Sequence, residues 1–281
     1  MKGRLALLLS LAAAGAIFLG SVSGVAAAGE TKIRVLHASP DAPAVDVYVD
    51  GAKALTAVPF GTISDYLVVP AGAHRLQVFA TGTTTGAVID ATPTFEADKA
   101  YTVAATNALA KIEAQVIVDD PMPKSDMAQV RAVHLSADAP AVDVAPRGSA
   151  ADAAIVKGLV YPKNTGYMDV KAGSYALDVR LAGTTTVALA LPTLNVANGD
   201  SYSVFVIGSA ASPAVGKGLT QVVTVDAKGA AAMASVPPTS TAPAGNGTSS
   251  VLPVALLLFA LAGVGFFAGA RVAAARASNR D

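Results

Sequence analysis

Two residue types with distinctive chemistry are missing from this chain, since its 281 residues include no cysteine and no tryptophan. Without cysteine there can be no disulfide, no thiolate zinc site and no cysteine nucleophile. The lack of disulfides does not indicate a cytoplasmic protein, because a β-sandwich with a full hydrophobic core can be exported without them. The compartment has to be judged from the ends of the chain instead.

The chain also lacks net charge and the common catalytic motifs. Its formal charge is zero, and acidic residues slightly outnumber basic ones between residues 29 and 250. A nucleic-acid-binding surface would need a cluster of Lys and Arg, which is absent from this stretch. The phosphate-binding loop, the dinucleotide fingerprint, the metalloprotease helix motif and the Gly-x-Ser-x-Gly elbow are absent too. We therefore expect no nucleic-acid partner, no cofactor and no enzyme of these classes.

What the chain does contain is an internal duplication. The stretch from Arg34 to Gly51 returns, without a gap, as the stretch from Arg131 to Gly148. The residues that recur at the same spacing are Arg34, His37, Ser39, Asp41, Pro43, Asp46 and Gly51, which reappear as Arg131, His134, Ser136, Asp138, Pro140, Asp143 and Gly148. The duplication predicts two homologous domains, residues 29–118 and 129–226, joined by a turn-rich linker at 119–128.

Each copy shows the pattern of short strands. Runs rich in Val, Ile, Leu, Tyr and Thr are interrupted by Gly, Pro or Asp every 8 to 12 residues or so. In the first copy this pattern predicts strands at residues 33–38, 45–49, 54–58, 64–69, 74–80, 87–95, 101–106 and 112–118. About seven or eight short strands in a domain of this length are typical of an immunoglobulin-like fold. The predicted fold class is all-β, with two tandem immunoglobulin-like β-sandwich domains.

The N-terminal segment has the features of a secretory signal peptide. Lys2 and Arg4 precede an uncharged apolar run that ends at Leu19, and small residues at 26–28 provide a cleavage site. We expect residues 1–28 to be a signal peptide, and the alternative is an uncleaved N-terminal anchor.

The C-terminal segment has the features of a membrane span. Residues 251–270 carry no charge, and such a helix would be about 30 Å long, which matches the apolar thickness of a bilayer. Arg271, Arg276 and Arg280 follow, so the positive-inside rule predicts a cytoplasmic tail at 271–281 and extracellular domains. Residues 227–250 are uncharged after Lys228 and rich in Ala, Ser, Thr, Pro and Gly, as in a disordered stalk. Leu252-Pro253 leaves covalent attachment to a cell wall as an alternative, although Val254-Ala255 stands where a sorting motif has Thr-Gly.

The duplicated motif resembles a known family. The Arg34-Val-Leu-His string, the Ser-Pro-Asp-Ala-Pro element and the tandem Pro-Ala-Gly hairpin resemble DUF4397, a bacterial domain family of unknown function. The resemblance covers both copies, and the second departs from it at Ala137 and at residues 145–147. It implies an exported β-sandwich module and implies no activity.

His37, Ser39 and Asp41 invite comparison with a catalytic triad. Residues two apart on a strand point to one face about 6.6 Å apart, which is too far for the hydrogen bond between serine and histidine. We expect Ser39 and Asp41 to accept local backbone N–H bonds in an Asx-type turn that Pro43 ends. The two histidines are expected to be satisfied residues on a half-buried strand.

Asp41, Asp46 and Asp50 are the weak candidates for a metal site. Their carboxylates, with carbonyls of the same loop, could bind Ca²⁺. Asp50 is replaced by Arg147 in the second copy, so this site would belong to the first copy alone.

The seven tyrosines could form a stacking platform for carbohydrate. Tyr66 and Tyr101 recur as Tyr167 and Tyr202, which favours a core or tyrosine-corner role for these four. The freer candidates are Tyr48, Tyr161 and Tyr175.

Together these features predict a single-pass type I membrane protein of the cell envelope with two non-catalytic modules. Interaction, adhesion or an envelope-structural role is expected, with the lipid bilayer contacted through residues 251–270. The other partner would be an extracellular protein, a polysaccharide or a second copy. The alternative is a secreted metal-dependent or hydrolytic enzyme that uses the loop of Ser39 and Asp41.

Overall fold

A computed structural model of the chain describes residues 29–211 and 217–229, all of which belong to one compact unit. These residues form β-strands, and their helical segments are two short 3₁₀ turns, η1 (Leu109–Lys111) and η2 (Ala151–Ala153). The prediction of an all-β fold is confirmed. None of the helical segments described is long and apolar enough to cross a membrane. The expected signal peptide (1–28), nearly all of the stalk (227–250), the span (251–270) and the tail (271–281) lie outside the described residues.

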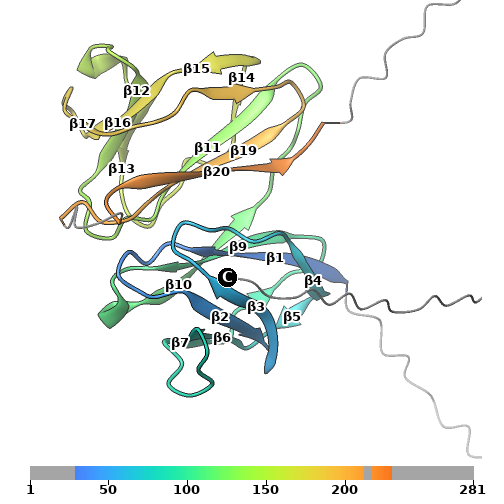
Figure 1. The fold of residues 1–281 in the computed structure, drawn as a ribbon. Helices are drawn as coiled ribbons and strands as arrows, with labels where there is room; N and C mark the ends of the chain where they lie inside the picture. Colours follow the sequence, from blue (N-terminus) through green and yellow to red (C-terminus); the bar gives the residue numbers. More distant parts are fainter. Residues whose placement is uncertain (1–28, 212–216, 230–281) are drawn as a thin grey trace, which may run out of the picture. The chain divides into compact units, whose positions relative to one another are not determined.

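The first repeat consists of short strands joined by turns (Figure 1). Its strands are β1 (Glu30–His37), β2 (Val45–Val49), β3 (Ala52–Val58), β4 (Leu67–Pro70), β5 (Gly72–Ala73), β6 (Leu76–Ala80), β7 (Ile89–Ala91), β8 (Thr94–Phe95), β9 (Ala100–Thr106) and β10 (Glu113–Asp119). The strand expected at 87–95 is divided into β7 and β8 around Pro93, which has no N–H to donate to a sheet.

The second repeat follows the same order. Its strands are β11 (Ala128–His134), β12 (Val142–Pro146), β13 (Val156–Leu159), β14 (Met168–Val170), β15 (Gly173–Tyr175), β16 (Leu177–Leu181), β17 (Val187–Ala190), β18 (Leu194–Val196), β19 (Ser201–Ile207) and β20 (Thr220–Ala227).

Each repeat has two four-stranded sheets and a small two-stranded one. The first repeat has the sheets β10-β9-β1-β4 and β3-β2-β6-β7, and β5 pairs with β8. The second repeat has β14-β11-β19-β20 and β13-β12-β16-β17, and β15 pairs with β18. The duplicated motif begins on an interior strand in both cases. β1 lies between β4 and its parallel neighbour β9, and β11 lies between β14 and its parallel neighbour β19.

The core of each repeat lies between its two four-stranded sheets. In the first repeat Val35 of β1 packs with Val47 of β2, Val78 of β6 and Ala105 of β9. In the second repeat Val144 of β12 and its neighbours on β16 and β19 form the corresponding cluster. Burial of these side chains is the main favourable contribution to folding. One face of β1 is therefore apolar because its side chains pack in this core.

The opposite face of β1 is buried as well, because it contacts the other repeat. Leu36 of β1 and Ala104 of β9 share a hydrophobic cluster with Val133 of β11 and Phe205 of β19. The two sheets that contain the duplicated motif therefore contact each other, and β1 and β11 carry buried residues on both of their faces.

Arg34 crosses this interface at the centre of a buried polar network. Its Nε donates to Thr102 Oγ1 at 2.8 Å within the first repeat. Its Nη1 donates to Thr224 Oγ1 at 3.0 Å and its Nη2 to Asp226 Oδ1 at 2.6 Å, and both acceptors belong to the second repeat. Burial lowers the pKa of Arg34, but Asp119 and Asp226 outweigh this effect and raise it above its ordinary value. Arg34 is therefore charged and paired across the interface.

Arg131 makes the reciprocal set of contacts. Its Nε donates to Ser203 Oγ at 2.6 Å within the second repeat. Its Nη1 donates to Val118 O at 2.7 Å, and its Nη2 forms a short ion pair with Asp119, so the acceptors now belong to the first repeat. Because each arginine binds the last strand of the other repeat, the contacts have an approximate two-fold symmetry.

A tyrosine covers each arginine. Tyr66 lies 4.6 Å from the guanidinium carbon of Arg34, and Tyr167 lies 4.6 Å from that of Arg131, both measured to the ring centroid. Their hydroxyls donate to Asp119 at 2.6 Å and to Asp226 at 2.7 Å respectively. Burial raises the pKa of both phenols, and the neighbouring carboxylates add to this effect while the arginine charges oppose it only in part, so both phenols remain neutral donors.

Phe205 is one position at which the symmetry fails. Its ring lies 6.0 Å from the guanidinium carbons of both Arg34 and Arg131, so it stands between them. The register of β9 and β19 places Ala104 at the corresponding position of the first repeat. One phenylalanine opposite one alanine therefore fills the centre of the interface.

Candidate functional site

The loop between β1 and β2 lies beside the loop that follows β9, because strands paired in parallel end at the same edge of a sheet. Asp41 of the first loop accepts a hydrogen bond from the backbone N–H of Leu109 in the second, 2.6 Å away. The prediction that Asp41 accepts a local Asx-type hydrogen bond is therefore wrong. Its carboxylate ties together two loops that are 68 residues apart in the chain.

Asp138 has the same position in the second repeat and makes more bonds. It accepts from Ser209 Oγ at 2.5 Å and from the N–H groups of Ala210 at 3.0 Å and Ala211 at 3.1 Å, all in the loop after β19. It also accepts from Ser136 Oγ at 3.2 Å. Burial alone would raise the pKa of this carboxyl, but these hydrogen bonds hold it below its ordinary value. Asp138 is a structural anion whose acceptor positions are largely used.

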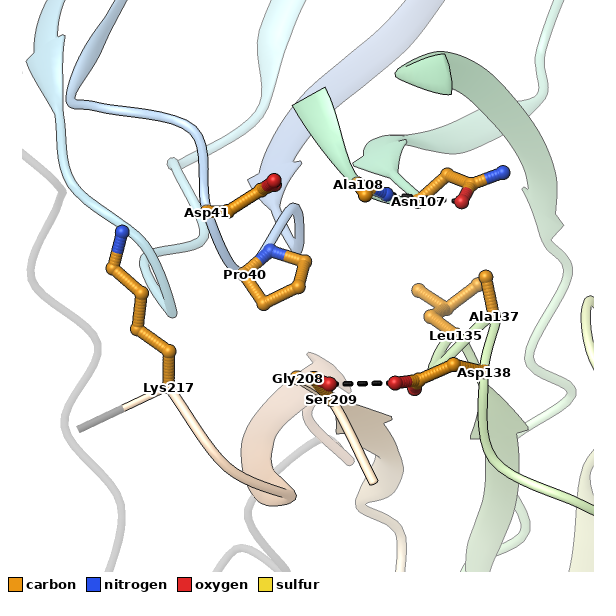
Figure 2. Close-up of a pocket in the computed structure, with 10 residues that line it drawn as sticks. All are labelled: Pro40, Asp41, Asn107, Ala108, Leu135, Ala137, Asp138, Gly208, Ser209 and Lys217. Atoms are coloured by element: carbon orange, nitrogen blue, oxygen red, sulfur yellow. Dashed lines mark hydrogen bonds between the residues drawn. The ribbon is translucent and has the colours of Figure 1, made fainter. Parts of the chain in front are cut away.

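Both aspartate loops border one cavity of about 250 Å³, which we call the inter-repeat cavity (Figure 2). The first repeat contributes Pro40, Asp41, Asn107 and Ala108 to its lining, and the second contributes Leu135, Ala137, Asp138, Gly208, Ser209 and Lys217. The duplicated loops thus build a single composite site rather than two separate ones.

The inter-repeat cavity combines an apolar wall with charges of both signs. Pro40, Leu135 and Ala137 supply the apolar part. Asp41 is exposed and uses its Oδ1 atom for the bond to Leu109, so its Oδ2 atom can accept from a ligand. Lys217 extends along the wall toward the Asp41 loop, where its Nζ lies 3.4 Å from the carbonyl oxygen of Ala42 (Figure 2). Such a surface suits a small polar group with both donors and acceptors.

The histidine and serine of the motif do not line this cavity. His37 and Ser39 are fully buried, and His37 Nε2 donates to the carbonyl oxygen of Pro43 at 2.9 Å. Burial lowers the pKa of His37, so the ring is neutral and its Nδ1 atom carries no proton. Neither that Nδ1 atom nor Ser39 Oγ has a hydrogen-bond partner, so the local bond expected for Ser39 is not formed. His134 is buried and neutral in the same way.

Comparison with known proteins agrees with this duplicated architecture. The sequence profile of the family described as "Domain of unknown function (DUF4397)" matches residues 31–145 and 149–244. The chain belongs to this family. The first matched range ends within β12 and the second begins just after it, whereas the sheets divide the chain between β10 and β11. The DUF4397 description assigns no activity to either repeat.

Other comparisons add little about function. No curated protein matches the chain. Among solved structures, "The Bacillus anthracis TIE protein" is similar with 11% sequence identity and a TM-score of 0.22. That likeness covers 64% of this chain and 34% of the solved one, so the chain spans about a third of the length of that protein.

The three aspartates considered for metal binding have separate protein partners in the first DUF4397 repeat. Asp46 is buried and accepts from Lys53 Nζ at 2.7 Å and from the N–H of Ala57 at 2.8 Å. These bonds lower the pKa of Asp46 to about 2. Asp50 accepts from His74 Nδ1 at 2.5 Å, and Asp41 accepts from the loop after β9. Within residues 29–211 and 217–229 there is no cluster of three or more His, Asp or Glu side chains able to hold a metal ion.

The recurring tyrosines have the structural roles expected of them. Tyr101 and Tyr202 are buried, and their hydroxyl oxygens accept from the N–H groups of Glu96 at 3.1 Å and Ala197 at 3.2 Å. The unpaired tyrosines do not gather either. Tyr48 packs edge-on against Phe79, Tyr161 binds Glu113 at 2.7 Å, and Tyr175 lines the interior of the second repeat.

Sequence reasoning missed the residues after β9 and β19. Asn107, Gly208, Ser209 and Lys217 line the inter-repeat cavity, but the duplicated motif does not include them. The parallel pairing that places them beside the motif joins segments that are distant in sequence. One signal was available, namely that Arg34 and Arg131 recur with apolar residues directly on either side of them, which indicates a buried ionic contact.

Proposed function

We propose that the protein is a membrane-anchored cell-surface protein whose paired modules are non-catalytic and bind an extracellular partner at the inter-repeat cavity. The apolar segments at residues 1–28 and 251–270 support export and anchoring, and the basic residues after 270 support an extracellular position for the repeats. Both modules would then project from the membrane on the stalk at 227–250.

The modules are immunoglobulin-like in the general sense of two antiparallel-rich sheets that enclose one core. Their strand order differs from the constant-type arrangement, in which sheets of four and three strands are formed and the first strand lies at an edge. Here each sheet of the pair has four strands, and β1 and β11 lie inside their sheets. This interior position is what brings the duplicated loops to the interface.

The observation that carries the binding proposal is the composite origin of the cavity. Two copies of one loop, each bonded through its aspartate to the loop after the neighbouring parallel strand, line a single space of about 250 Å³. A ligand site generally combines an apolar surface with a few convergent polar groups, and this cavity has both. Among the described residues its lining includes no aromatic side chain, on which a sugar ring would stack, and it carries two carboxylates and an ammonium group. These features favour a short polar segment of a protein partner over a polysaccharide.

The burial of the motif supports a non-catalytic role. A nucleophilic serine has to reach its substrate, whereas Ser39 is fully buried. The enzyme alternative would therefore require the loop of Ser39 and Asp41 to open. Hydrolytic turnover by the purified full chain that is lost in Asp41→Ala would favour this alternative.

Selection of displayed random peptides against the purified full chain tests the proposal. Peptides should be enriched by the wild type, and their binding should be lost in Ala137→Trp, which fills the cavity, and weakened in Asp41→Asn. Ala52→Trp, at an exposed position on β3 outside the lining, is the matched control and should bind as the wild type does.

The proposal fails if no peptide is enriched, or if Ala137→Trp and Ala52→Trp bind alike. If the protein binds a glycan on an array and Ala137→Trp abolishes this binding, the partner at this site is a polysaccharide. Surface proteolysis of intact cells tests the topology separately, since the repeats should be cleaved while the tail stays protected.

A further inference from the structure

The interior of the second repeat holds a larger apolar cavity than that of the first. The space measures about 70 Å³ in the second repeat and about 20 Å³ in the first. Corresponding residues line both, namely Val35, Val47, Leu76, Val78, Val103 and Ala105 in the first and Ala132, Val144, Leu177, Val179, Val204 and Val206 in the second. The two cavities therefore occupy the same place in the fold, and the first repeat is an internal reference for the second.

Smaller side chains on β11 account for part of the difference, although Val206 on β19 is larger than its counterpart Ala105. Ile33 and Val35 of β1 correspond to Val130 and Ala132 of β11, which are each smaller. Beside them, Phe95 is fully buried in the first repeat, where the second repeat has Val196 at the equivalent place in the small sheet. Interiors are normally close-packed, so a space retained in one of two copies needs a physical reason.

The residues that line the cavity of the second repeat become more exposed from its inner wall to its rim. Ala132, Val179 and Val206 on its inner wall are buried. Met168 and Tyr175 are half-buried, and Ile155 is 58% exposed. An apolar ligand could therefore enter from the side of these residues.

Polar atoms contribute no surface to this cavity, and that decides the chemistry of its occupant. A buried water needs two to four polar partners, so an apolar cavity stays dry and accepts apolar groups. A dry cavity of about 150 Å³ holds benzene, so one about half that size suits a smaller group. We propose that the second repeat binds the end of a saturated alkyl chain in this cavity, with the rest of the chain along Ile155 and Tyr175. This inference is independent of the function proposed above.

Xenon is a suitable first probe because it reports apolar cavities without needing an opening as large as an alkyl chain requires. In crystals of the full chain under xenon pressure, we expect an atom beside Ala132 in the second repeat and none beside Val35 in the first. The variant Val130→Ile/Ala132→Val restores the residues of the first repeat and should lose the xenon site. Ala132→Val alone serves if the double variant fails to fold. A site that persists in the filled variant, or xenon absent from the second repeat, overturns the proposal.

Photoreactive alkyl probes then test the ligand class and its source. A fatty acid with a diazirine near the chain end, and vesicles of phosphatidylcholine with the same group on an acyl chain, would each be irradiated with the full chain. Crosslinks to Ile155, Met168 or Tyr175 that disappear in the filled variant support the proposal. Labelling by the free acid alone identifies a soluble alkyl ligand, and labelling from vesicles identifies a lipid chain. Crosslinks elsewhere, or equal in both proteins, contradict it.

Discussion

Replacement of Asp226 by Asn removes one charge from the network between the repeats while the shape of the side chain is kept. Asp226 Oδ1 accepts from Arg34 at 2.6 Å, and Oδ2 accepts from Tyr167 at 2.7 Å and, at short range, from Ser203. An amide group would leave the guanidinium without its charged partner in the second repeat, where the Thr224 hydroxyl would still accept from it. In one orientation the N–H₂ group of the asparagine would face the hydroxyls of Tyr167 and Ser203, which donate to Asp226 in the wild type. In the other orientation it would face the guanidinium group of Arg34, which also has only donors.

The expected loss in free energy of unfolding follows from this geometry. Removal of one partner from a buried ion pair costs about 3–5 kcal/mol, because the other charge stays buried. Asp119 lies 3.2 Å from Arg34 and compensates in part, so we expect Asp226→Asn to fall near 3 kcal/mol, at the low end of that range. Asp119→Asn should cost more, since this carboxylate pairs with both arginines.

Denaturant unfolding of the full chain measures both values, with Asp90→Asn as the control. Asp90 pairs with Arg75 on the surface, where the side chains are 40% and 57% exposed, and such pairs contribute about 0–1 kcal/mol. The two carboxylates therefore make similar contacts in different solvent environments. If Asp226→Asn is as mild as Asp90→Asn, the buried network does not hold the repeats together and the reasoning is refuted.

Three further predictions rest on single contacts. Phe205→Ala should lower the free energy of unfolding by about 3–5 kcal/mol in the same assay, and a loss under about 1 kcal/mol would mean that the interface collapses around the gap. The hydrogen bond that His74 donates to the Asp50 carboxylate raises the pKa of His74, so this group stabilises the fold below pH 6.5 or so and loses that contribution as the pH rises through its raised pKa. The loss caused by His74→Gln should accordingly shrink from about pH 5.5 to about pH 9, and a constant loss would exclude a protonated ring. Ser39→Ala should be neutral or stabilising by about 1 kcal/mol because it removes an unpaired buried hydroxyl, whereas Ser136→Ala, which loses a bond to Asp138, should destabilise, and equal effects would contradict this contrast.

The strands and the duplication could be predicted from local sequence, because both depend on neighbouring residues. Val45–Val49 is a strand with the predicted bounds, and the alternation of apolar residues in the other segments places their strands to within a few residues. The strand predicted at 87–95 wrongly continued through Pro93, although the missing N–H of this proline explains the break there.

The composite cavity could not be predicted, because it depends on which strands become neighbours. Asp41 has the residue type and position of a local turn, and its bond to Leu109 exists only because β1 and β9 run in parallel. The role of Arg34 was hidden for a related reason. Its partner Asp226 lies 192 residues away, on the last strand of the other repeat. Long-range pairing of this kind leaves little trace in one sequence.

The pairing of one phenylalanine with one alanine at the interface has a consequence for how such a protein can arise. In a homodimer of identical single-domain chains, a substitution on one side appears on the other, so the symmetry axis would meet either two phenylalanines or two alanines. Two alanines leave a void, and two phenylalanines compete for one space. Fusion of the copies into one gene frees each half to mutate alone. The unequal pair of Phe205 and Ala104 in one cluster is therefore a solution that two identical chains cannot adopt, and its acquisition would make the fusion of the halves hard to reverse.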